Sequence, residues 1–135
     1  MIYLLLSFIC VSLASLCNAI MDTLDHHHSI SIFTKMKNPL WWNSDKGWRN
    51  KYVDRDPNKG RVKWFLGINK PVQITDAWHF FKMLLIIFMC TGIVLSTKAP
   101  FYDDAPLYYY LILLLGLGIT WNMTFSLFYE KLLLK

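Results

Sequence analysis

Three long uncharged stretches dominate the pattern of apolar and polar positions along the chain. No charged residue interrupts the 20 positions between residues 1 and 22, the 15 between 82 and 98, or the 25 between 104 and 130. A helix needs about 20 mostly apolar residues to cross the hydrocarbon core of a bilayer. The pattern therefore predicts an all-α membrane protein with three transmembrane helices.

The chain divides accordingly into six predicted segments. They are transmembrane helix 1 with a cytoplasmic extension (1–32), a basic aromatic cytoplasmic loop (33–75), transmembrane helix 2 (76–98), a short external loop (99–105), transmembrane helix 3 (106–129) and a cytoplasmic tail (130–135). Pro100 ends the second helix because proline cannot continue one. Asp103 and Asp104 complement the positive end of the third helix.

The first apolar stretch has two interpretations. A secretory signal has a basic region ahead of an apolar run of about 7–15 residues. No residue before Asp22 is basic, and the apolar run is longer than that of a typical signal. A retained anchor helix is therefore favoured, and a cleaved signal peptide is the alternative.

Composition narrows the class of protein. Only 17% of the residues are charged, against about 25% in ordinary soluble domains, and 55% are hydrophobic. These values exclude a soluble globular enzyme and a disordered chain. Cys10, Cys17 and Cys90 all fall within predicted spans, where we expect them to pack as small apolar residues rather than to form disulfides.

Helix packing in a membrane relies on small residues, because lipid gives apolar helices no hydrophobic reason to associate. Each predicted span carries one pair of small residues four positions apart: Ser15 and Ala19, Gly92 and Ser96, and Gly116 and Thr120. Asn18 and Asn122 are polar residues within spans, so we expect both to face protein rather than lipid.

The charge distribution predicts the orientation in the membrane. Residues 35–70 contain ten basic and three acidic residues, a net charge of +7, whereas the whole chain carries +5. Positively charged loops of this length stay in the cytoplasm. The amino terminus is then outside, the loop and the carboxyl terminus are cytoplasmic, and the predicted location is the bacterial inner (plasma) membrane.

Aromatic and basic residues alternate within the predicted loop. Docking on an anionic lipid bilayer is favoured over binding of nucleic acid, because tryptophan prefers the membrane interface and each basic residue there gains about 1 kcal/mol. The expected headgroup-binding residues are Trp41, Trp42, Arg49, Lys51, Arg61, Lys63 and Trp64. A turn signal at 56–60 favours a short hairpin between 51–55 and 61–66, and the aromatic content predicts that the loop is ordered.

Two short motifs accompany this loop. They are Gly47-Trp48-Arg49-Asn50-Lys51-Tyr52 and Thr75-Asp76-Ala77-Trp78-His79. Together they resemble a group of small bacterial integral-membrane proteins with an SW-x-NKY stretch ahead of a TD-x-WH at a helix start, although Gly47 stands here in place of the serine. The resemblance covers roughly residues 20–82 and implies a membrane location without a particular activity.

Two Asp–His pairs with helical spacing are the one constellation with potential chemistry. Asp22 and His26 are four residues apart at the inner end of the first helix, and Asp76 and His79 are three apart at the inner end of the second. If they converge, they form a site for Zn, Fe or Mn. The favoured alternative is structural: hydrogen-bonded pairs that tie the two helices together.

The favoured function is that of a small inner-membrane accessory or scaffold subunit, whose partner is another membrane subunit or a second copy of the chain. The alternative is a membrane-embedded, metal-dependent enzyme that acts on a lipid or another amphiphile through the Asp/His cluster.

Overall fold

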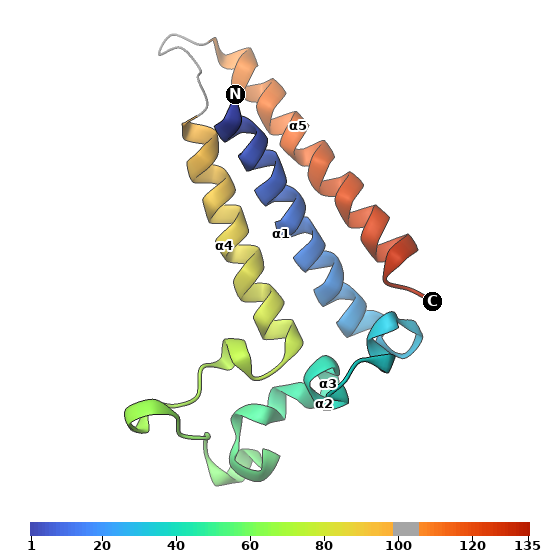
Figure 1. Ribbon diagram of the computed structural model, residues 1–135, viewed down its shortest axis with the longest axis vertical. Helices are drawn as coiled ribbons and strands as arrows, with labels where there is room; N and C mark the ends of the chain where they lie inside the picture. The colour runs from blue at the N-terminus through green and yellow to red at the C-terminus, as the bar shows by residue number, and fades with distance from the viewer. Residues whose placement is uncertain (99–105) are drawn as a thin grey trace.

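The computed structural model describes residues 1–98 and 106–135, and three long helices make up most of it (Figure 1). These are α1 (Ile2–His26), α4 (Ala77–Thr97) and α5 (Leu107–Ser126), which continues as a π-helical segment, η8 (Leu127–Leu132). Each of the three is long and apolar enough to cross a membrane, as the uncharged stretches predict. The predicted external loop, with Pro100, Asp103 and Asp104, lies outside the described residues.

Short helical turns fill the connection between α1 and α4. They are η1 (His28–Ile30), η2 (Ile32–Lys35), α2 (Pro39–Trp42), α3 (Ser44–Gly47), η3 (Trp48–Lys51), η4 (Val53–Arg55), η5 (Pro57–Lys59), η6 (Phe65–Gly67) and η7 (Val72–Ile74). Within the predicted first segment (1–32), helix α1 ends at His26. After it, the chain turns and the side chain of Ser31 caps η2 by accepting from the Phe33 N–H.

Helix α1 lies between α4 and α5, and the three run roughly side by side (Figure 1). The Ser7 hydroxyl donates to the Gly92 carbonyl of α4 at 2.9 Å, and the Ser15 hydroxyl donates to the Trp121 carbonyl of α5 at 2.7 Å. Gly116 of α5 lies against an aromatic ring of α1. Small residues thus allow the close approach of α1 to both neighbours.

Two residues expected to pack inside the protein face outward instead. Asn122 is exposed, and its amide donates to the Gly118 carbonyl of its own helix. Cys90 is exposed as well, whereas Cys17 is buried and Cys10 is half-buried. Asn122 is exposed because α5 touches the bundle along one side only, and no residue of Leu107–Ser126 is buried.

The hydrophobic core sits at the end of the bundle that carries the loop. It combines residues from α1, the loop, α4 and the carboxyl terminus: Ala19, Ile20, Leu24, Phe33, Ala77 and Leu133. The Ile32 N–H donates to the Leu133 carbonyl at 3.0 Å, and the Lys135 N–H donates to the Ile30 carbonyl at 2.9 Å. The residues after α5 are therefore held against the start of the loop.

The predicted hairpin is present as a single antiparallel bridge between Tyr52 and Arg61, and the described residues contain no extended strand. The Val53 N–H donates to the Gly60 carbonyl at 3.1 Å. Asp56 fixes the turn, because its carboxylate accepts from the Asn58 N–H at 2.9 Å.

Candidate functional site

The carboxylate of Asp76 is the most buried charged group at the junction between the loop and α4, with 2% of the residue exposed. It caps the helix by accepting from the His79 N–H at 3.0 Å. It also accepts from the Thr75 hydroxyl at 3.0 Å and contacts Nδ1 of His79 at 2.8 Å. The second predicted Asp–His pair is therefore formed within the first turn of α4.

The GWRNKY motif packs directly against this capped turn. The Asn50 amide donates to the Thr75 carbonyl at 3.0 Å. A Cβ on Gly47 would lie 2.9 Å from the Asp76 Cβ and 2.9 Å from the Leu40 carbonyl oxygen, closer than side-chain carbons approach. The two motifs thus form one contact, which we call the loop–α4 joint (Gly47, Asn50, Thr75, Asp76 and His79). Sequence reasoning noted both motifs but did not predict that they meet.

The other predicted pair lies elsewhere. Asp22 is half-buried and accepts from the Asn18 amide at 3.5 Å, while His26 is exposed. Asp22 follows Ser15 by seven residues, so both lie on the side of α1 that faces α5. Asp76, in contrast, lies against Gly47 at the end of α3. Within residues 1–98 and 106–135, no group of three or more His, Cys, Asp or Glu side chains is placed to hold a metal ion.

The four residues Asp22, His26, Asp76 and His79 therefore do not assemble into the predicted site for Zn, Fe or Mn. The favoured alternative is formed in part: Asp76 and His79 pair, but they stabilise the joint between the loop and α4 rather than linking α1 to α4. With Nδ1 of His79 directed at the carboxylate, Nε2 is the ring atom left for other contacts.

Two of the predicted headgroup-binding residues point inward. Trp42 stacks on Phe33 with ring centroids 4.9 Å apart, and Trp41 contacts Trp42 at 4.8 Å and Phe80 at 5.9 Å. Both tryptophans pack against the core. They hold the loop onto α4, and each is half-buried.

Of the four basic residues in that set, Arg49 and Lys63 are exposed, whereas Lys51 and Arg61 are half-buried. The Arg49 guanidinium lies 5.4 Å from the Trp48 ring centroid, and the Lys51 ammonium lies 5.7 Å from it. Lys63 donates to the Asn69 side chain at 2.9 Å, and Arg61 donates to the Lys70 carbonyl. Arg49 and Lys63 therefore present their charges to solvent, while Nε of Arg61 is buried within the loop.

Trp64 begins an exposed turn that we call the apolar tip (Trp64–Ile68). The Trp64 N–H donates to the Ile68 carbonyl at 2.7 Å, which closes the turn. The exposed fractions are 59% for Trp64, 71% for Phe65, 82% for Leu66 and 63% for Ile68. Of these four residues, only Trp64 was among the predicted headgroup-binding residues, although four large apolar residues around Gly67 were the signal for this turn.

A comparison with known protein families, characterised proteins and solved structures finds no match for this chain. The described residues define the class: a helical protein in which they form three helices that are long and apolar enough to span a membrane. A folded connection is fixed to the second of these helices through the loop–α4 joint.

Proposed function

We propose that this chain is an accessory or scaffold subunit of a membrane complex in the bacterial inner membrane. Its amino terminus is outside, and its loop and carboxyl terminus are in the cytoplasm. The net charge of +7 between residues 35 and 70 supports this orientation. The loop and the carboxyl terminus also lie at the same end of the bundle, as the orientation requires (Figure 1).

The observation that carries the proposed subunit role is the position of Asn122. This amide has two donors and an acceptor oxygen, and one donor is used within its own helix. Because a polar side chain within a span favours protein over lipid, the exposed side of α5 is suited to a partner helix. Gly118 lies one turn earlier, and a Cβ there would meet nothing within 4 Å, so a partner can approach closely.

The loop–α4 joint supports a structural rather than an enzymatic role. Its buried carboxylate is engaged by Thr75 and His79. The described chain brings together no metal-binding group around it. We therefore propose that the joint keeps the basic loop as a fixed platform on the anionic leaflet.

The test of the subunit role is the size of the native complex. The tagged chain, extracted from its native membranes in a mild detergent, is expected to migrate in a complex of defined stoichiometry. Asn122→Leu and Gly118→Leu are expected to release the chain from that complex. Met123→Leu, at the neighbouring exposed position of α5, is the matched control and should leave the complex intact.

A different result would contradict the proposal. If the wild-type chain migrates as a monomer, or if both α5 variants stay in the complex as the control does, the exposed side of α5 is not a subunit interface.

A further inference from the structure

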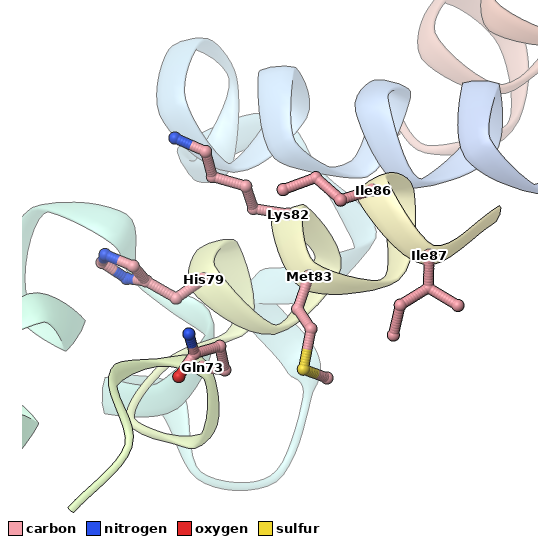
Figure 2. Close-up of a pocket in the computed structure, with 6 residues that line it drawn as sticks. All are labelled: Gln73, His79, Lys82, Met83, Ile86 and Ile87. Atoms are coloured by element: carbon pink, nitrogen blue, oxygen red, sulfur yellow. The ribbon is translucent and has the colours of Figure 1, made fainter. Parts of the chain in front are cut away.

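A pocket of about 340 Å³ opens on α4 at the level where the loop meets the apolar span (Figure 2). Its lining comes from η7 and from the first three turns of α4: Gln73, His79, Lys82, Met83, Ile86 and Ile87. The volume lies within the range of small-molecule sites, which is roughly 300–1,000 Å³.

The end of the pocket nearest the loop is polar and basic. His79 and Lys82 extend to the same side of α4, with Gln73 beside His79 (Figure 2). The contact between Nδ1 of His79 and Asp76 fixes the ring, and in the imidazolium form the Nε2–H is left to donate to a ligand oxygen. The Lys82 ammonium lies 4.7 Å from the Trp78 ring centroid. None of the ion pairs among the described residues uses Lys82, so its charge is not neutralised by a carboxylate.

The other end of the pocket is apolar. Met83, Ile86 and Ile87 follow the polar residues along α4, and the two isoleucines are about half exposed. Since a helix rises 1.5 Å per residue, the lining changes from charged to apolar within about 7 Å along the helix axis. An amphiphile that lies along α4 fits this change, with its polar group at the loop end and its chain in the span.

We propose that this pocket binds an anionic phospholipid. The phosphate contacts Lys82, His79 and Gln73, and the first part of one acyl chain lies on Met83, Ile86 and Ile87. No carboxylate lines the pocket, because the nearby carboxylate of Asp76 is turned toward Thr75 and His79. The site takes one lipid and is distinct from diffuse attraction of the loop to the leaflet, and it does not depend on the proposed partner of α5.

Native mass spectrometry of the full-length chain in detergent tests the proposal. Phosphatidylglycerol is expected to bind with a stoichiometry of one, and phosphatidylcholine with the same acyl chains is expected to bind about tenfold more weakly. Glycerol 3-phosphate, which has the phosphate but no acyl chain, should not compete. Lys82→Met should weaken binding of phosphatidylglycerol about tenfold, because it removes the charge and keeps most of the volume.

Lys98→Met is the matched control, since it removes a lysine from the opposite end of the same helix, and it should bind as the wild type does. Ile86→Trp is a second variant that fills the apolar end and keeps every polar group, and it too should lower binding. Equal binding of the two lipids, full competition by glycerol 3-phosphate, or wild-type affinity in both pocket variants would overturn the proposal.

Discussion

At Gly47 the backbone of the loop comes so close to α4 that a methyl group would lie 2.9 Å from the Asp76 Cβ. We expect Gly47→Ala to push the loop away from the capped turn and to destabilise the fold by about 1–3 kcal/mol, the usual range for overpacking. Thermal unfolding in detergent measures the effect. Lys46→Ala is the control, because it removes an exposed side chain next to Gly47 and should not lower the unfolding temperature.

Asp76 combines a helix cap with contacts to two side chains. Asp76→Ala is expected to lower the free energy of unfolding by at least the value typical of a lost helix cap, about 0.5–2 kcal/mol. The loop should then be cut faster by protease, because its anchor on α4 is lost. Asp45→Ala removes an exposed acid from the same loop and should leave the cleavage rate unchanged. Equal rates of loop cleavage in the Asp76→Ala and Asp45→Ala variants would show that the loop–α4 joint does not hold the loop.

Helix α4 lies within the predicted second span (76–98), whereas α1 ends at His26, before the end of the predicted first segment (1–32). The start at Asp76 was predictable because the residue precedes an uncharged run and is a good cap. The joint itself was not predictable from sequence pattern. It depends on a contact between Gly47 and Asp76, and no periodicity relates residues so far apart. The Asp22–His26 and Asp76–His79 pairs both have spacings that place two residues on one side of a helix, but such a spacing does not reveal which neighbour that side faces.

The apolar tip is the element most suited to enter the membrane interface. It presents Trp64, Phe65 and Leu66 to solvent, and Lys63 precedes it. In anionic vesicles, an environment-sensitive fluorophore on Leu66→Cys should show blue-shifted emission. The same fluorophore on Asn58→Cys, at the polar turn of the hairpin, should emit as in water. Identical emission at the two sites would show that the tip does not enter the lipid.

For the whole molecule, α1 is the helix on which the others depend. It supplies most of the buried residues, including Ser7, Ala14 and Leu24, and it lies between α4 and α5. A chain cut near Ala19, as a signal peptidase would cut it, would lose most of this packing surface.

The proposed orientation makes a prediction for the whole chain. In a background without the native cysteines, Asn58→Cys should resist a membrane-impermeant thiol reagent in intact cells and react after permeabilisation. Asp103→Cys should react in intact cells. The reason is that the strongly basic loop is retained in the cytoplasm. Labelling of the Asn58 position in intact cells would contradict the proposed orientation and indicate the opposite one.

The attachment of the last residues to the start of the loop has a consequence for biosynthesis. Leu133 is part of the core, and Lys135 pairs with Ile30. During translation, α1 and the loop leave the ribosome long before these residues exist. The core at the loop end therefore lacks Leu133 until α5 and the residues after it have emerged, so the newly made chain passes through a stage at which this core is incomplete.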